Sequence, residues 1–267
     1  MKLITLARAE IEKLLASRRG MLSLLAFVLV WLLVLRYAIA PAAKMLGTGD
    51  DDGLVEFLLS QLGLEALTSW PAPQLAIYWV IGLYMLPLFA VVTAADQMAS
   101  DRSRGTLRYL IMRASRLEIF FGRFFGHAFI QLLMVLVTLA SVLIFIAVDT
   151  PDRLSDSLSR SLMVVLNIWL VLLPYVALMA WVSVIARSPR QATTLAIIVW
   201  IVVSLLIGWV QAKYGPMPWL DWTLPGSQVS ALLRLSDWKT LDLALIPVLH
   251  TVVLLGIGAV TMARRDL

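Results

Sequence analysis

The sequence predicts an all-α polytopic membrane protein with six transmembrane helices, and three observations support this fold class. Hydrophobic residues make up 61% of the 267 residues and charged residues only 15%, whereas about a quarter of the residues in soluble domains are charged. Apolar runs of about 20 residues recur, which is the length at which a helix crosses the hydrocarbon core. These runs lack the alternation of apolar and polar residues that is typical of membrane β-strands.

The first 20 residues predict an amphipathic elbow helix that lies in the membrane interface ahead of the first span. Apolar residues recur at helical spacing from Leu3 to Leu15, and charged residues occupy the other faces. The alternative, a secretory leader ending near Ala40, is disfavoured because that leader would be long and would contain Glu10 and Glu12. We therefore assign this helix to the inner membrane surface.

Six apolar runs follow, and we treat residues 1–267 as a single transmembrane domain. The first outer segment, 41–73, contains an apolar piece at 54–67 that is too short to span and predicts an interfacial or re-entrant helix. The second outer segment, 213–240, is rich in Pro and in Trp, which is typical of a membrane interface. The spans are predicted at about 21–40, 74–95, 124–148, 162–186, 191–212 and 241–262.

The distribution of positive charge predicts how these spans are oriented. Fifteen of the 22 Lys and Arg residues fall in the first 20 residues, in 96–123, in the turn at 187–190 and at the carboxyl terminus. Lys and Arg accumulate in cytoplasmic loops, so we assign all four segments to the cytoplasm. The prediction is a multi-pass protein of the cell (inner) membrane with both termini inside.

Residues 96–123, here called the basic segment, form a long cationic interruption between the second and third spans. Its six Arg residues are Arg102, Arg104, Arg108, Arg113, Arg116 and Arg123. From Gly105 onward apolar residues are interleaved with these charges, which favours short helices lying at a membrane surface. Such an element offers a cytoplasmic partner both charges and apolar anchors.

The sequence shows no catalytic or metal-binding motif. It contains no Cys, which excludes disulfides and thiolate sites, and no GxxxxGK[ST], HExxH or GxSxG pattern. The two His residues, His127 and His250, lie on different spans. We therefore predict no catalytic residue, no metal site and no cofactor bound by this chain. The net charge of +5 is explained by residues that border the spans, so we expect no nucleic-acid partner.

The spans also lack a visible source of energy for transport. No Asp, Glu, Lys or Arg is predicted at mid-depth, although ion-coupled transporters usually need such a group. The residues considered for a substrate pathway are Gln131, Asn167, Trp181 and His250. The simpler interpretation of these residues is that they pack and hydrogen-bond between helices.

Two stretches resemble the type-2 class of ABC exporter permeases. In the basic segment, residues 101–107 read DRSRGTL, 115–119 read SRLEI and 122–124 read GRF. This is similar to the family's loop, in which an acidic residue precedes Gly-Thr-Leu and a Ser-Arg leads to the Gly-Lys that opens the next span. Residues 10–15, EIEKLL, are similar to the family's elbow helix, and the whole layout resembles that of copper-site maturation permeases. Asp101 replaces the usual Glu and Arg123 the usual Lys, so both positions keep their charge.

The resemblance implies a permease subunit of an ATP-driven ABC exporter that works with a separate cytoplasmic ATPase. In that family the ATPase binds ATP and Mg, and the loop between spans 2 and 3 docks on it as a coupling helix. Members dimerise, which implies a homodimer or a paralogous heterodimer surrounded by membrane lipid. Carried over to this sequence, ATPase docking is predicted for Asp101, Arg104, Gly105, Thr106, Leu107, Arg108, Arg116 and Glu118.

A second function stays open at this point. The chain could be a non-transporting scaffold that relays ATPase motion to an extracytoplasmic protein through its two outer segments. Charge reversal at Arg104 and Arg108 is predicted to abolish ATPase binding under either function.

Overall fold

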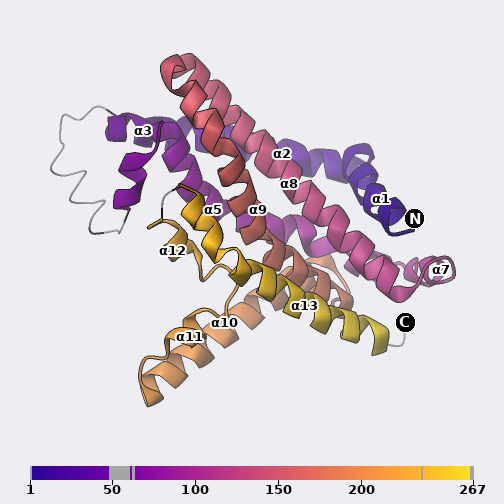
Figure 1. The fold of residues 1–267 in the computed structure, drawn as a ribbon. Coiled ribbons are helices and arrows are strands. Elements are labelled where there is room, and N and C mark those ends of the chain that lie inside the picture. Colours follow the sequence, from indigo (N-terminus) through magenta and orange to yellow (C-terminus); the bar gives the residue numbers. More distant parts are fainter. Residues whose placement is uncertain (1, 48–60, 62–63, 236, 265–267) are drawn as a thin grey trace.

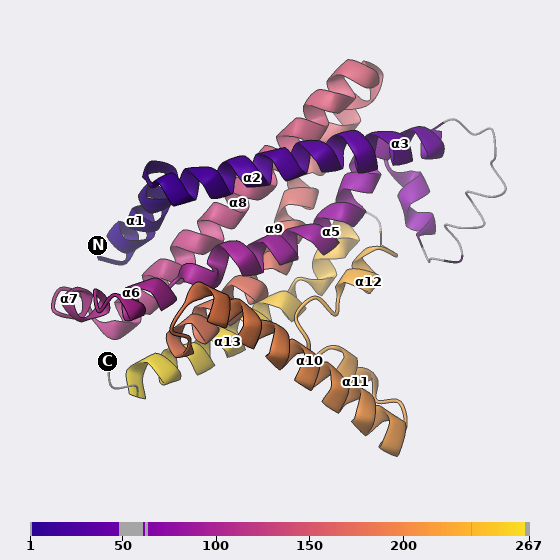
Figure 2. The ribbon, with the colours of Figure 1, turned by 180° about the vertical axis from the view of Figure 1, so that it is seen from behind.

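The apolar runs of the sequence become long helices in the computed structural model, which describes residues 2–47, 61, 64–235 and 237–264 (Figure 1). Within these ranges six helices are long and apolar enough to cross a membrane, and no strand occurs. This confirms the predicted all-α fold class with six candidate spans. Both termini lie at one end of the bundle, beside the short helix α7 (Leu107–Ile111) (Figures 1 and 2).

A sharp turn separates the amphipathic helix α1 (Lys2–Ala16) from the first long helix, α2 (Arg18–Val34). The Ser17 hydroxyl oxygen accepts a hydrogen bond from the Gly20 amide at 3.0 Å and so caps α2. A Cβ atom on Gly20 would collide with the backbone of Leu14, so the turn depends on glycine. The chain continues from α2 through a π-helical turn (Leu35–Ile39) into α3 (Ala40–Gly47).

Five further long helices complete the bundle, and several extend beyond the spans predicted from the sequence. They are α5 (Pro73–Thr93), α8 (Arg116–Asp149), α9 (Leu154–Ile185), α10 (Pro189–Tyr214) and α13 (Leu245–Arg264). Short helices α11 (Pro218–Asp221) and α12 (Val229–Leu232) lie between α10 and α13, followed by a 3-10 turn at Asp237–Leu243. Most of the piece predicted at 54–67 lies outside the described residues. Its last residues fall in a 3-10 turn at Glu65–Ser69.

Helix α9 forms the centre of the bundle. It packs against α5, α8, α10 and α13, and 67% of its most apolar stretch is buried. Side chains such as Val164, Ile168, Val176 and Met179 are fully buried there. The remaining helices therefore pack around α9 or lie at the edge of the bundle.

Hydrogen bonds between helices reinforce this packing. Tyr78 on α5 bonds to Thr138 on α8 at 3.1 Å, and Trp31 on α2 donates to Ser141 on α8 at 2.8 Å. The indole of Trp169 on α9 donates to the Ala128 carbonyl of α8 at 2.9 Å. Such bonds are typical of helix packing in lipid, where a polar group has no water to bind.

Candidate functional site

The basic segment is folded into short helices rather than an extended loop. After a 3-10 turn at Ala94–Asp96, it forms α6 (Ala99–Ser103) and α7 before it enters α8. Gly105 joins α6 to α7 with a φ of +70°, a backbone conformation that glycine adopts without strain. A capping box then starts α8, in which Ser115 and Glu118 bond to each other's backbone amides. The basic segment is therefore a structured element and not an extended loop.

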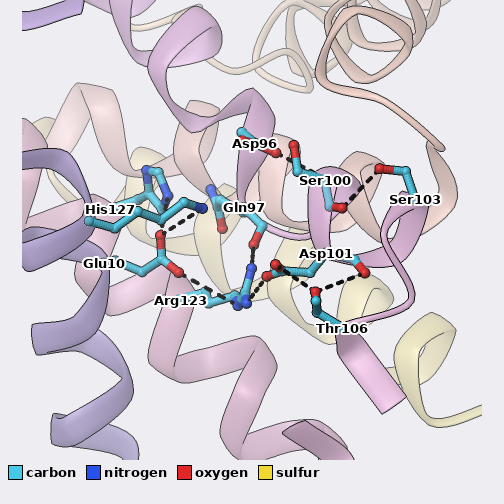
Figure 3. Close-up of polar contacts among 10 residues, drawn as sticks. Glu10, Asp96, Gln97, Ser100, Asp101, Ser103, Thr106, Arg123 and His127 are labelled. Carbon is cyan, nitrogen blue, oxygen red and sulfur yellow. Dashed lines mark hydrogen bonds and ion pairs between the residues drawn. The ribbon is translucent and has the colours of Figure 1, made fainter. Parts of the chain in front are cut away.

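Arg123 on α8 joins the basic segment to the amino-terminal helix. Its side chain is buried, forms an ion pair with the Asp101 carboxylate of α6 and donates to the Gln97 backbone carbonyl (Figure 3). Its Nε atom lies 3.7 Å from a carboxylate oxygen of Glu10 on α1. We call Glu10, Gln97, Asp101, Arg123 and His127 the Arg123 cluster.

Glu10 is the buried acid on the α1 side of the cluster. One of its carboxylate oxygens lies 3.5 Å from His127 Nε2 on α8 and 3.8 Å from the Lys13 ammonium. Burial alone would raise the pKa of Glu10, but the hydrogen bond and charge of His127, followed by the charges of Arg123 and Lys13, lower this pKa to about 2. Glu10 is therefore ionised at neutral pH and holds α1 against the cationic side of α8.

Gly126 allows α1 to approach α8 this closely. A Cβ atom at this position would lie 3.0 Å from both the Ala7 carbonyl oxygen and the Glu10 Cβ atom. The sequence carries the pattern Gly122-xxx-Gly126, which predicts a close helix approach. The structure identifies α1 as the helix that uses this space.

Two other Arg residues of the basic segment bind the ends of neighbouring helices. Arg102 donates from Nη1 to the carbonyls of Val184 and Ile185, at 2.9 and 2.8 Å, where α9 ends. Arg116 donates to the Ala263 carbonyl at 3.1 Å, in the last turn of α13. A cation at a helix carboxyl terminus also interacts favourably with the helix dipole. The basic segment is thus attached to α1, α8, α9 and α13 by Arg side chains.

The basic segment also carries exposed apolar and cationic side chains. Tyr109 and Met112 are 69% and 75% exposed. Contiguous exposed apolar surface on a protein can mark an interaction site. Arg104 and Arg113 are exposed on the same segment. The basic segment therefore has two groups of side chains. Some Arg residues attach it to the bundle, and other side chains remain exposed.

Comparison with known families identifies the chain. The sequence model described as ABC-2 family transporter protein matches residues 4–267. The chain belongs to this ABC-2 transporter family. None of the curated proteins searched matches the chain. Membrane subunits of the ABC-2 family are not themselves catalytic, and the family generally pairs with an ATPase subunit.

The ABC-2 docking residues predicted from the sequence occupy different environments. Arg104 is exposed, and Thr106 bonds through its hydroxyl to an Asp101 carboxylate oxygen at 3.0 Å. Leu107 is only 4% exposed, so its side chain packs inward in the single chain. Arg116 donates to the Ala263 carbonyl of α13, Glu118 caps the start of α8, and Gly105 forms the bend. Arg108 lies on α7, but its side chain is outside the described part of the structure.

The four pathway candidates of this ABC-2 protein contact different neighbours in the fold. Gln131 donates to Thr93 at 2.7 Å, and Asn167 donates to Thr240 at 2.9 Å and to the Met163 carbonyl at 3.0 Å. A His250 ring nitrogen lies 2.8 Å from the Trp222 carbonyl oxygen. The fourth candidate, Trp181, packs beside Gly258 of α13. No recorded hydrogen bond joins any two of the four in the described ranges, and the simpler interpretation as packing residues accounts for their contacts.

Glu10, Arg123 and His127 are the residues whose joint role the sequence analysis missed. The available signal was a charged residue and a His four positions apart, Arg123 and His127, flanking Gly126 on an otherwise apolar helix. That spacing puts both side chains on one helix face. Their partner on α1 could not be found without the fold. Within the described residues, no group of three or more His, Cys, Asp or Glu could hold a metal ion.

Proposed function

We propose that this ABC-2 protein is the permease subunit of an ATP-driven exporter of the inner membrane, with both termini in the cytoplasm. Family membership and the six candidate spans support a transporter subunit. Both termini and α7 lie at the same end of the bundle (Figures 1 and 2), which agrees with the cytoplasmic assignment made from the distribution of Lys and Arg. ATP and Mg bind to the separate ATPase.

The observation that carries the proposal is the two-sided construction of the basic segment. Its exposed side chains include Tyr109, Met112 and Arg104, and we take them to form an open face that joins apolar and cationic groups, as protein interfaces do. Its inner face is attached to α1, α8, α9 and α13. An ATPase seated on the open face can therefore move four helices through one rigid element.

The transmitted motion would be a rigid-body rearrangement. When ATP binding closes the ATPase pair, the two basic segments of a permease dimer are displaced. The Arg123 cluster passes this displacement to α1 and α8, and Arg102 passes it to α9. Packed helices move between discrete arrangements rather than deforming continuously, so the dimer alternates between two states that expose the substrate path to opposite sides.

The dimer is a proposal that the exposed span α10 supports. Only 6% of its most apolar stretch is buried within the chain. Ser204, Gly208 and Ala212 follow one another at intervals of four on this helix, and such small residues allow two membrane helices to approach closely. We propose that a second copy, identical or paralogous, covers this face.

Co-purification of the ATPase tests the docking face. The double variant Arg104→Glu and Arg108→Glu, expressed with the partner ATPase, is expected to insert normally and to lose the ATPase on purification. The matched control is Arg187→Glu with Arg190→Glu, which reverses two exposed charges in the turn between α9 and α10. Undiminished ATPase recovery with the first variant would show that the docking site lies elsewhere.

The scaffold function remains a second candidate, because a specific observation favours it. The pathway candidates Gln131 and Asn167 are bonded to their neighbours, whereas Trp219 and Trp238 are 66% and 51% exposed in the second outer segment and could contact an extracytoplasmic protein. Reconstituted complexes distinguish the two functions. An exporter moves substrate without any outer partner, whereas a scaffold hydrolyses ATP without moving substrate and is stimulated by that partner.

A further inference from the structure

A hollow of about 390 Å³ lies beside the Arg123 cluster, with several charged residues in its lining. It is lined by α1, the start of α2, the end of α5, the helix α6 and His127 of α8. These elements meet at the end of the bundle where both termini lie (Figure 2). The residues that matter for its chemistry are Glu10, Lys13, Arg18, Asp96, Asp101, Arg104 and His127.

The three carboxylates of the hollow are already engaged. Glu10 contacts Arg123, His127 and Lys13. Asp101 pairs with Arg123 and accepts a hydrogen bond from Thr106, and Asp96 accepts one from the Ser100 amide at 3.0 Å. Their negative charge is therefore largely compensated within the protein.

The cations of the hollow form fewer ion pairs than its carboxylates. The side chains of Arg18 and Arg104 are exposed, and no ion pair of either is recorded among the described residues. Lys13 reaches only Glu10, at 3.8 Å. Guanidinium groups bind phosphate oxygens strongly and with two parallel hydrogen bonds. The hollow consequently has donors to spare for an anion.

Two independent features also point to a bound anion. The first turn of α2, a helix of 17 residues, lines the hollow with Ser17, Arg18 and Gly20, and a helix amino terminus favours negative charge. His127 lines the hollow while its side chain is 9% exposed; its Nε2 atom lies 3.5 Å from Glu10, and its Nδ1 atom has no hydrogen-bond partner among the described residues. A buried imidazole with a free nitrogen is costly unless a ligand completes its bonding.

We propose that this hollow binds the phosphate of an anionic phospholipid headgroup. The helices α2 and α5 are candidate spans that end here, and α1 is amphipathic, as is typical of a helix in the headgroup layer. Basic pockets between membrane helices bind anionic headgroups in this way. The bound phosphate would join Lys13 and Arg18 at the amino-terminal elbow to Arg104 of the basic segment.

Lipid retention by the purified full-length chain tests this site without any ATPase. Detergent-solubilised protein is mixed with phosphatidylglycerol or phosphatidylcholine, and the retained lipid is counted by native mass spectrometry. The wild-type chain is expected to retain phosphatidylglycerol selectively, and Arg18→Gln is expected to lower this retention about fivefold. The matched control is Arg8→Gln, which removes an exposed α1 cation that pairs with Glu12 at 2.8 Å and is not among the residues that line the hollow.

Three outcomes would overturn the proposal. The first is equal retention of both lipids, and the second is an equal loss of phosphatidylglycerol retention in Arg8→Gln and Arg18→Gln. The third is a rise in unfolding temperature with inorganic phosphate that is as large as the rise with phosphatidylglycerol. The last result would assign the hollow to a soluble anion instead of a lipid. If Arg18→Gln fails to fold, Lys13→Gln provides the same comparison from α1, because the Lys13 side chain is 46% exposed.

Discussion

The junction of α1 with α8 and the span α10 are built on opposite principles. At the junction, a buried ion cluster and a glycine bring two helices into close contact within one chain. Helix α10 has only Ala192 and Ala196 buried and exposes large apolar residues such as Ile201, Leu205 and Trp209. Toward its carboxyl end it diverges from the other long helices (Figures 1 and 2).

The two regions differ in where their packing partners come from. The α1–α8 junction is packed within the chain, whereas the exposed apolar face of α10 needs lipid or another protein to cover it. At the junction the carboxylates of Glu10 and Asp101 are paired with Arg123 of the same chain, so contacts within the chain hold α1 against α8. Helix α10 leaves an apolar hollow of about 600 Å³ against α5 and α9, bounded by the segment 221–229.

The largest effect is expected from removing the central cation of the junction. Arg123→Met would leave the buried carboxylate of Glu10 and the carboxylate of Asp101 without their shared partner, at a cost of about 3–5 kcal/mol. Thermal unfolding in detergent measures this loss. Arg8→Gln, which breaks an exposed pair on the same helix, should cost less than about 1 kcal/mol. Equal losses in the two variants would contradict the importance assigned to the cluster.

A smaller effect is expected from filling the space at Gly126. Gly126→Leu would push against the Ala7 carbonyl and Glu10, and overpacking of this kind costs about 1–3 kcal/mol. Cysteine pairs placed across α1 and α8, in a chain that has no native Cys, should then form disulfides more slowly. Unchanged disulfide formation and an unchanged unfolding temperature would show that the contact is not tight.

The corresponding change on α10 should affect assembly rather than folding. A Cβ atom on Gly208 would meet no atom within 4 Å among the described residues of the single chain, so Gly208→Leu should leave the unfolding temperature of the chain unchanged. It should lower the dimer fraction measured by light scattering if a second copy packs on this face. Gly256→Leu on α13, where a Cβ atom is equally free, is the control and should change neither quantity.

The dependence of stability on pH tests the state of Glu10. Because its pKa is lowered from 4.5 to about 2 in the folded protein, ionised Glu10 stabilises the fold fully above about pH 4.5. This stabilisation is lost as the pH falls toward 2. The difference in unfolding temperature between wild type and Glu10→Gln should therefore be constant near neutral pH and shrink below about pH 4.5. A difference that grows on acidification would contradict the assigned ionisation.

The sequence was sufficient for the features that depend on local pattern. Apolar run lengths predicted the six candidate spans, and Gly122-xxx-Gly126 predicted a close approach of helices. It was not sufficient for the direction in which side chains of the basic segment point. Leu107 packs inward while Tyr109 and Met112 face outward, because the bend at Gly105 sets the orientation of α7.

The sequence also could not predict which charged residues pair across long distances in the chain. Glu10 and Arg123 are separated by more than a hundred residues, and only the fold brings them together. Helices α8 and α9 also extend beyond the predicted spans, through 116–123 and 154–161, and at the start of α8 a capping box supports this extension.

Site-specific cross-linking tests most directly whether the basic segment is the docking surface for an ATPase. A single cysteine, Met112→Cys, is unique in this chain and exposed, and it can carry a short thiol-reactive photo-cross-linker. The account predicts an adduct between the permease and its ATPase from this position and none from Trp219→Cys in the second outer segment. An ATPase adduct that forms from Trp219→Cys and not from Met112→Cys would contradict both the docking surface and the orientation of the chain in the membrane.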